Sequence, residues 1–381
     1  MKIAILTLPL HSNYGGIIQN YALQTVLERM GHEVYTINIP LPKVKISSAK
    51  APLCIAKRFL KKILEKKDGI IFIERKINRD KIIAEQHVRR FINDNIHLTQ
   101  PYYGKKDLSA LNNKNLNAVI VGSDQVWRIP YVYPDIETFF LDFIKNKQIK
   151  KLAYSVSFGT DEVEFSAEQI KACGKLIKEF EIISVREQSA IQLINNIYKW
   201  ECKTKPIHTL DPTMLLNKED YIKISTKYSH ETHKGGLFYY ILDMTNEKMK
   251  LLQKISSDLG LEPFTVQPKS KNQLDKAEDK IIPPIEEWLQ AFNQASFVFT
   301  DSFHGSVFSI LFNKEFITIG NQDRGMTRFN SLMNLFNLQN RFITSIDEYT
   351  KQISEVIHWN PINEVLEKER EKSFNILRQI N

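Results

Sequence analysis

A histidine, an aspartate and a serine stand close together in the stretch "TDSFHGSVFSILFNK", residues 300–314. The histidine is His304, which follows Asp301 by three residues and precedes Gly305. Imidazole exchanges protons near neutral pH, so a histidine at the rim of a cleft is suited to general acid–base catalysis. The alternative is a capping or partly buried histidine without a chemical role. Asp301 and Ser302 carry the same ambiguity, because they either cap a helix or orient His304.

Three arginines follow predicted strands and are candidates for holding an anion. Arg186 comes directly after an apolar run in "IISVREQSA", and Arg324 and Arg328 lie in "GNQDRGMTRFNS". A buried guanidinium needs a negative partner. For Arg186 that partner is either a neighbouring carboxylate, Glu187 or Asp211, or the carboxylate or phosphate of a ligand held in a bidentate clamp. For Arg324 and Arg328 the alternative is weak surface ion pairs.

Two glycines open a predicted helix in "SNYGGIIQNYAL", directly after the first apolar run. The backbone N–H groups of Gly15 and Gly16 can form an amide platform for a ligand, because helix N-termini attract anions. Asn13, Tyr14 and Gln19 are candidates for further hydrogen bonds to it. The spacing is neither GxGxxG nor a Walker A motif, so no dinucleotide fingerprint is present. The alternative role of both glycines is a tight turn.

The stretch "VGSDQVW" also places polar residues after an apolar run. Ser123 and Asp124 are candidates for binding a sugar hydroxyl, while Asp124 alternatively caps a helix. Trp127 either stacks on a sugar ring or belongs to the core.

Strands and helices must alternate to place these loops, and the sequence shows that alternation throughout. Short apolar runs end in polar loops that lead into helical patterns, which predicts βαβ units and an α/β fold. We expect two Rossmann-like domains whose parallel sheets face a cleft, because ligands bind beyond the carboxyl ends of such strands. The predicted organisation is a first domain over 1–217 with a basic helical insertion at about 51–100, a second over 218–355, and a helical tail over 356–381. The boundary falls in the polar stretch 217–236, and the helix of the tail is expected to break at Pro361.

Composition agrees with an ordinary globular protein of 381 residues, 43% of them hydrophobic and 25% charged. The three cysteines, Cys54, Cys173 and Cys202, lie far apart, which suggests neither a disulfide framework nor a metal site and fits a cytoplasmic location. The first residues predict a buried strand rather than a leader peptide. No run of about 20 uninterrupted apolar residues predicts a membrane span.

The formal net charge of +8 is concentrated in residues 57–83, where lysine and arginine alternate with apolar residues. The segment is either the solvated face of an amphipathic helix or a surface for an anionic partner, which is an acidic substrate or a membrane face. No nucleic-acid-binding motif accompanies it, so we expect no nucleic acid partner.

The series of motifs resembles the polysaccharide pyruvyl transferase family. The carrying stretches are "SNYGGIIQNYAL", "VGSDQVW", "AYSVSFG", "SVREQSA", "LDPTMLL" and "TDSFHGSVFSILFNK", which span most of residues 1–340 and leave the basic insertion outside. The resemblance implies a GT-B-like fold and transfer of a pyruvyl ketal from phosphoenolpyruvate to two hydroxyls of a sugar. It implies a glycan or lipid-linked acceptor in capsule, exopolysaccharide or cell-wall assembly on the cytoplasmic side, with no metal or cofactor expected.

The resemblance also suggests residue roles. His304 is similar to a family histidine and would protonate the methylene carbon of phosphoenolpyruvate, with Asp301 beside it. Better-known members carry an arginine two residues before that histidine, where this chain has Ser302, so Arg324 or Arg328 must supply the charge if the donor is the same. The expected donor-binding residues are Arg186, Ser302, Gly305, Arg324 and Arg328. The expected acceptor-binding residues are Asn13, Tyr14, Gly15, Gly16, Gln19, Ser123 and Asp124.

Two other functions remain open at this point. One is a GT-B glycosyltransferase that uses a nucleotide sugar, with Glu286 or Glu287 before "WLQAF" as a carboxylate for the ribose. The other is a non-catalytic glycan-binding protein, which the serine at position 302 favours slightly.

Overall fold

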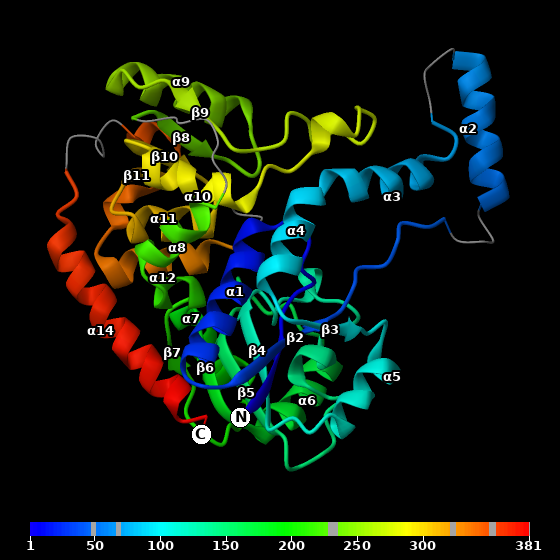
Figure 1. Cartoon of the computed structure of the whole chain (residues 1–381), viewed down its shortest axis with the longest axis vertical. Helices are drawn as coiled ribbons and strands as arrows, with labels where there is room; N and C mark the ends of the chain where they lie inside the picture. The colour runs from blue at the N-terminus through cyan, green and yellow to red at the C-terminus, as the bar shows by residue number, and fades with distance from the viewer. Residues whose placement is uncertain (47–50, 66–69, 228–234, 321–324, 350–355, 381) are drawn as a thin grey trace.

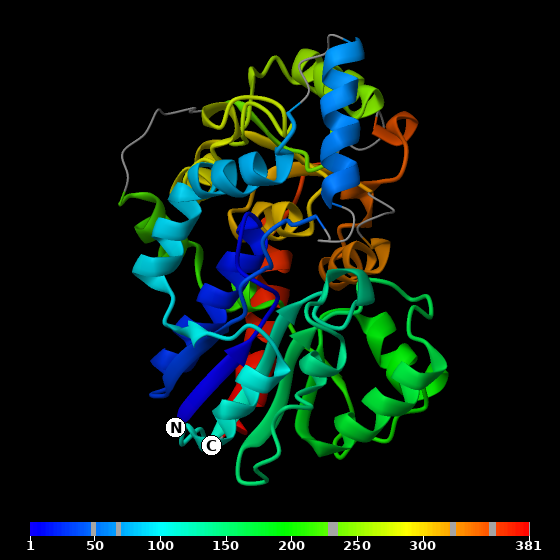
Figure 2. The ribbon, with the colours of Figure 1, turned by 90° about the vertical axis from the view of Figure 1, so that its right-hand side faces the viewer.

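Two parallel β-sheets form the framework, one in each half of the chain (Figures 1 and 2). The computed structural model describes residues 1–46, 51–65, 70–227, 235–320, 325–349 and 356–380. The first sheet has seven strands in the order β3-β2-β1-β4-β5-β6-β7, and the second has five in the order β12-β11-β10-β8-β9. The paired strands run parallel in both sheets. The predicted α/β fold with two Rossmann-like parallel sheets is therefore confirmed.

The strands are short, and most of them end at a polar loop. The strands of the first sheet are β1 (Lys2–Leu6), β2 (Glu33–Asn38), β3 (Leu98–Pro101), β4 (Ala118–Asp124), β5 (Lys150–Val156), β6 (Phe180–Val185) and β7 (Ile207–His208). Those of the second are β8 (Leu237–Tyr240), β9 (Pro263–Phe264), β10 (Phe297–Thr300), β11 (Glu315–Ile319) and β12 (Phe342–Ile343).

Helices cover both faces of each sheet. In β1, Ile3 and Ile5 pack into one hydrophobic cluster while Ala4 and Leu6 pack into another on the opposite face. Because both faces are buried, the strands read as continuous apolar runs rather than as alternating patterns. The helices are α1 (Tyr14–Arg29), α2 (Ala51–Glu65), α3 (Ile73–Ala84), α4 (Gln86–Asn95), α5 (Lys105–Leu108), α6 (Ala167–Leu176), α7 (Gln188–Gln192), α8 (Lys218–Ser225), α9 (Asn246–Leu259), α10 (Ile285–Gln294), α11 (Phe303–Leu311), α12 (Met326–Phe336) and α14 (Trp359–Arg378).

The insertion at 51–100 is helical as predicted over α2, α3 and α4, but it also contains β3. The sequence did not predict this strand, because "LTQP" is too short and too polar to show a strand pattern. It pairs with the edge strand β2, where Thr36 lies opposite Leu98.

The two domains share one continuous hydrophobic core that includes Ile3 of β1 and Phe238 of β8. Tyr14, at the start of α1, packs its ring against Tyr240 and Trp288 of the second domain. Its hydroxyl donates a hydrogen bond to the carbonyl of Pro283 at 2.6 Å. The start of α1 is thus fixed to the second domain.

The helix α14 returns from the second domain to the first (Figure 1). Arg370 donates hydrogen bonds to the carbonyls of Met214 and Leu216, and the Ser373 hydroxyl accepts one from the N–H of Leu210. The sequence predicted a helix break at Pro361, and this is wrong. Pro361 lies in the first turn of α14, where a missing N–H breaks no intrahelical bond.

Candidate active site

A cavity of about 370 Å³ lies where the two domains meet. Residues 8–13 follow β1, Asp124 ends β4, and residues 301–304 follow β10, so the carboxyl ends of strands from both sheets border it. Ligands of parallel α/β proteins bind at this position, beyond the carboxyl ends of the strands. The lining residues are 8–13, 16, 17, 41, 124, 125, 131, 240, 242, 301–304, 328 and 329.

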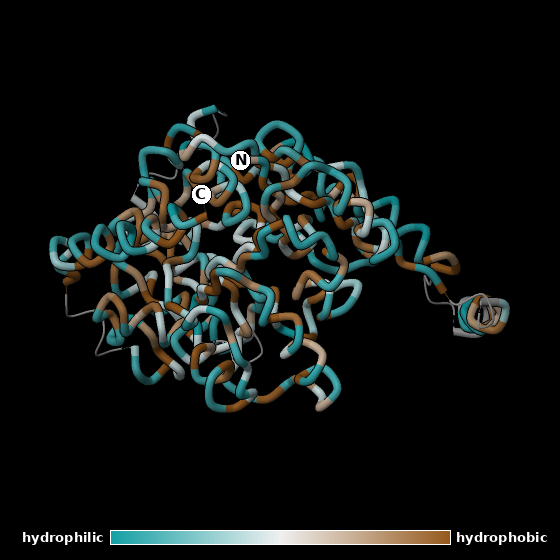
Figure 3. Tube along the Cα trace, turned by 90° about the horizontal axis from the view of Figure 1, so that it is seen from below, coloured by the Kyte–Doolittle hydropathy of each residue, from teal (hydrophilic) through white to brown (hydrophobic). Residues whose placement is uncertain are grey.

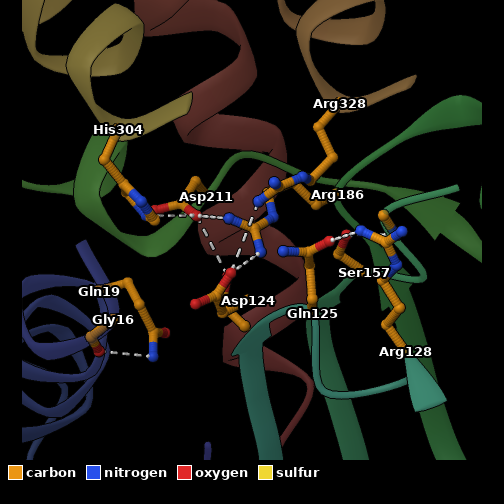
Figure 4. Close-up of polar contacts among 12 residues, drawn as sticks. Gly16, Gln19, Asp124, Gln125, Arg128, Ser157, Arg186, Asp211, His304 and Arg328 are labelled. Carbon is orange, nitrogen blue, oxygen red and sulfur yellow. Dashed lines mark hydrogen bonds and ion pairs between the residues drawn. The ribbon is translucent and has the colours of Figure 1, made fainter. Parts of the chain in front are cut away.

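Arg186 lies directly after β6, and each of its two terminal nitrogens donates a hydrogen bond to a carboxylate (Figure 4). Nη1 donates to Asp211 Oδ2 at 2.9 Å, and Nη2 donates to Asp124 Oδ1 at 3.0 Å. All three side chains are buried. Burial by itself would raise the pKa of Asp211, but the charge of Arg186, the nearby His304 and the hydrogen bond from Thr213 together hold that pKa well below its ordinary value. The three residues therefore form a permanently charged cluster beneath the cavity.

Asp124 lines the cavity from an unusual backbone conformation. Its φ is +70°, in the left-handed region that aspartate tolerates better than most residues. The strand ends there, and the carboxylate turns toward Arg186 and toward Arg328, whose Nη1 lies 3.6 Å from Oδ1. Burial opposes ionisation of Asp124, yet the charges of Arg186, His304 and Arg328 together lower its pKa. The predicted alternative of a helix cap is wrong, because Asp124 is the last residue of β4.

His304 is the second residue of α11 and borders the cavity. Its Nε2 lies 3.6 Å from Asp211 Oδ2, which is too long for a hydrogen bond, and this buried atom has no hydrogen-bond partner among the described residues. On its other side the ring lies directly against α1, because a Cβ built on Gly15 would fall 2.0 Å from Nδ1. The ring is thus fixed between the two domains.

Arg328, in the first turn of α12, lines the cavity with its guanidinium. Its charge lies 5.2 Å from the centre of the Phe303 ring, and the Arg186 guanidinium lies 4.8 Å from that centre. Burial, together with the nearby charge of Arg186, lowers the pKa of Arg328 to about 10. Arg328 remains charged at neutral pH. A negatively charged ligand beside it would stabilise its charged form.

The start of α1 faces the cavity from the first domain. Asn13 and Gly16 line the cavity, and the Asn13 side chain makes no capping hydrogen bond. The first N–H groups of a helix lack intrahelical partners and carry a partial positive charge. The cavity is therefore bordered by a buried arginine, a helix N-terminus, a carboxylate and an imidazole.

Comparison with known proteins identifies the family of this chain. The sequence matches the family described as polysaccharide pyruvyl transferase over residues 13–323. The chain belongs to the polysaccharide pyruvyl transferase family. No curated protein sequence matches it.

The solved structures that resemble this family member share its fold at very low sequence identity. UDP-N-acetylglucosamine 2-epimerase from Rickettsia bellii matches with a TM-score of 0.52 and 10% identity, covering 100% of this chain and 96% of the other. The 2-epimerase from Neisseria meningitidis bound to UDP-GlcNAc matches with a TM-score of 0.51 and 9% identity, covering both chains completely. The enzyme from Methanocaldococcus jannaschii gives 0.50 and 13%, again over both complete chains. These similarities confirm the predicted GT-B-like architecture and nothing finer.

In this pyruvyl transferase family member, several predicted site residues support the cavity without lining it. Gln19 is buried and donates hydrogen bonds to the Gly16 carbonyl (Figure 4) and to Thr7. Tyr14 is buried in the interdomain core. Ser123 is buried and donates to Asp211 at 3.2 Å. We assign these three residues to the framework of the site.

The loop before α11 is fixed from several sides. The Ser302 hydroxyl caps α11 by accepting a hydrogen bond from the N–H of Gly305, so that amide is not free for a donor. A Cβ on Gly305 would fall 2.2 Å from Thr300 Oγ1, so the close approach requires glycine. Asp301 accepts hydrogen bonds from the N–H groups of Leu242 and Asp243 and pairs with Lys248 at 2.7 Å. We therefore assign Asp301 to holding the loop.

Other residues at the site escaped prediction, and one predicted residue cannot be placed. Phe303 packs against both guanidinium groups, although its position between Ser302 and His304 gave no hint of that contact. Gln125, next to Asp124, also lines the cavity. Arg324 lies outside the described residues. In the described part of the chain, no group of three histidine, cysteine or acidic side chains could hold a metal ion.

Proposed function

We propose that this chain transfers the pyruvyl group of phosphoenolpyruvate to two hydroxyls of a sugar, in a cell-surface polysaccharide or its lipid-linked precursor. The observation that carries the proposal is that Arg328 and His304 both line one cavity, so that a buried cation and an imidazole border the same space. A donor with a carboxylate, a phosphate and a methylene carbon needs both an anion site and a proton source.

The donor is assigned to the second domain. Arg328 binds one of its anionic groups and takes the place of the arginine that Ser302 replaces. The buried Arg186 acts through electrostatics, since Asp124 and Asp211 already occupy its terminal nitrogens. The amides at the start of α1 add positive potential from the opposite side.

His304 is assigned the proton transfer. The imidazolium gives its proton to the methylene carbon of phosphoenolpyruvate, which becomes a methyl group and leaves positive charge at the adjacent carbon. One sugar hydroxyl attacks that carbon and returns a proton to His304. The second hydroxyl then forms the other carbon–oxygen bond while the bond to phosphate breaks, and its proton passes to the departing phosphate, so that a cyclic ketal and inorganic phosphate result. Asp211, at 3.6 Å, stabilises the positive ring.

The acceptor is assigned to the first-domain side of the cavity. Asn13 and Asp124 offer hydrogen-bonding groups to a sugar there, and Gly16 allows the sugar to approach the backbone. A bound hydroxyl on this side lies opposite the residues assigned to the donor, which is the geometry that transfer between two substrates requires.

The alternative donor, a nucleotide sugar, finds less support. Glu286 is buried and pairs with Arg90 at 2.7 Å, so it is committed to the insertion helix α4. Neither Glu286 nor Glu287 is among the residues that line the cavity.

The test combines turnover and ligand binding. We expect the purified protein to release phosphate from phosphoenolpyruvate in the presence of a suitable glycan acceptor, and His304→Ala to reduce the rate by about 10²–10⁴-fold. The exposed His97, which pairs with Glu28 at the surface, provides the matched control His97→Ala. Phosphoenolpyruvate should raise the melting temperature of the wild type but not of Arg328→Gln. A melting temperature raised by nucleotide sugars and not by phosphoenolpyruvate would contradict the proposal.

A further inference from the structure

The helices α2 and α3 form an arm that extends away from both domains. In Figures 1 and 3, α2 stands apart from the body of the molecule. The arm and the segment leading into it carry seven of the fifteen exposed large apolar side chains of the described residues, while the other eight are spread over the rest of the chain. The seven are Leu41, Val44, Leu53, Phe59, Leu60, Phe72 and Ile82.

One side of α2 contacts the protein and the other exposes apolar side chains to solvent. On the contacting side Cys54, Ile55 and Arg58 are half-buried. The Arg58 guanidinium pairs with Glu74 of α3 at 2.8 and 2.9 Å and donates to the Ile71 carbonyl. Leu53 and Leu60 lie on the opposite side of the helix, five and two positions from Arg58, with exposed fractions of 76% and 56%. An apolar side of α2 is thus left in solvent.

The charge on α2 identifies the partner that this apolar side fits. Lys57 and Lys61 are exposed, and the described side chains of the helix, residues 52–61, include no acidic residue. A second copy of α2 would bring positive charge against positive charge. A membrane surface that contains anionic lipid offers both an apolar layer for the leucines and Phe59 and negative headgroups for the lysines.

We propose that α2 docks this protein on an anionic lipid surface. The helix lies in the interface, with Leu53, Phe59 and Leu60 inserted among the acyl chains and Lys57 and Lys61 at the headgroups. The protein binds without spanning the bilayer, since no helix among the described residues is long and apolar enough to cross it.

The attachment of the arm makes this docking directional. Asp80 of α3 is buried and pairs with Lys280 of the second domain at 2.8 Å. Lys76 donates to the carbonyl of Asp275 at 2.7 Å. These contacts fix α3 against the second domain, so α2 is presented at a defined place relative to the rest of the molecule.

The experiment is flotation of the full chain with vesicles of phosphatidylcholine alone or mixed with phosphatidylglycerol. The wild type should float with the mixed vesicles and bind the neutral vesicles at least tenfold more weakly, with binding reduced at high salt. Leu53→Glu/Leu60→Glu and Lys57→Glu/Lys61→Glu should each reduce binding to the mixed vesicles by about tenfold or more. Val163→Glu, at an exposed apolar residue in the first domain, should bind like the wild type.

Thermal melting followed by circular dichroism checks that each variant is folded. The substituted side chains are exposed, so the melting temperatures should match that of the wild type, and Leu60→Ser provides a milder variant. Equal flotation of the wild type and Leu53→Glu/Leu60→Glu would overturn the proposal. It would also be overturned if light scattering showed a wild-type dimer that these substitutions converted to a monomer. Because no step measures turnover, a negative result leaves the proposed transfer reaction unaffected.

Discussion

Arg186 and Arg328 are both buried at the site, but their surroundings differ. Arg186 meets a carboxylate at each terminal nitrogen, whereas Arg328 lies 3.6 Å from Asp124 and has its pKa lowered to about 10. The sequence showed these two arginines and Arg324 after strands and could not rank them, because the partners of Arg186 come from β4 and from the loop after β7. The difference between the two arginines depends on which strand ends lie next to each other in the folded protein.

The cluster around Arg186 predicts how stability depends on pH. The pKa of Asp211 in the folded protein lies below its ordinary value of about 3.9. Its pairing with Arg186 therefore contributes full stability above about pH 4, and the contribution is lost as the pH falls toward the folded-state pKa. Asp211→Asn should lower the free energy of unfolding by about 3–5 kcal/mol at pH 7. Urea unfolding at pH 3, 4, 5 and 7 should show this difference shrinking below pH 4.

The exposed Asp94 supplies the matched variant. Asp94→Asn should change the free energy of unfolding by less than about 0.5 kcal/mol at each pH. A difference between wild type and Asp211→Asn that stayed constant down to pH 3 would show that the carboxylate charge of Asp211 does not stabilise the fold.

The residue types at the site could largely be anticipated from the loops that follow apolar runs. Asn13, Gly16, Asp124, His304 and Arg328 were singled out in this way, and all of them line the cavity. The supporting role of Gln19 and Tyr14 could not be anticipated, because neighbouring positions on a helix point to different sides and the sequence does not show which side faces the cavity. The contact between Phe303 and two arginines depends on tertiary packing and leaves no local pattern.

The elements that matter most are α1 and α11, which come from different domains and meet at Gly15 and His304. Gly15 has no side chain, and this allows the imidazole to lie against the backbone of α1. The sequence suggested a different reason for the glycine, an amide platform or a turn. The apposition of two helices nearly 300 residues apart could not be read from either segment alone.

Gly15→Ala should therefore displace the His304 ring. Its Cβ would fall 2.0 Å from Nδ1 of His304, so the ring or the helix must move. We expect a loss of stability of about 1–3 kcal/mol and a fall in kcat on the order of 10²-fold, because the proton donor is displaced. Thermal unfolding and steady-state phosphate release measure the two effects.

Gly104→Ala is the control for this substitution. Gly104 has open space around a Cβ, and its φ of 164° is accessible to any residue. Both stability and turnover should remain close to wild type. If Gly15→Ala kept wild-type kcat, the position of His304 against α1 would not matter to the reaction.

At the level of the whole molecule, the two domains are joined by a shared core. Residues of β1, α1, α10 and α11 belong to one hydrophobic cluster, and α14 connects the second domain back to the first. The sequence predicted two domains with a boundary in 217–236, but it gave no indication of how strongly they are coupled. Interdomain packing involves single side chains such as Trp288, which look like ordinary core residues in the sequence.

We expect the protein to unfold in a single cooperative transition. Exposing the core of either domain would also expose apolar surface of the other, so a half-folded state is disfavoured. Differential scanning calorimetry should give one peak with a calorimetric enthalpy close to the van't Hoff enthalpy. Two resolved peaks would show that the domains are energetically independent.

The path of α14 has a consequence for biosynthesis. Arg370 donates a hydrogen bond to the carbonyl of Met214. Met214 is synthesised 156 residues before Arg370. While those intervening residues are being translated, the first domain already has its seven strands but lacks the helix that covers them near Leu210. The nascent chain therefore exposes an unfinished apolar surface for the time needed to make a second domain. We infer that this interval is the period in which the protein most depends on a chaperone.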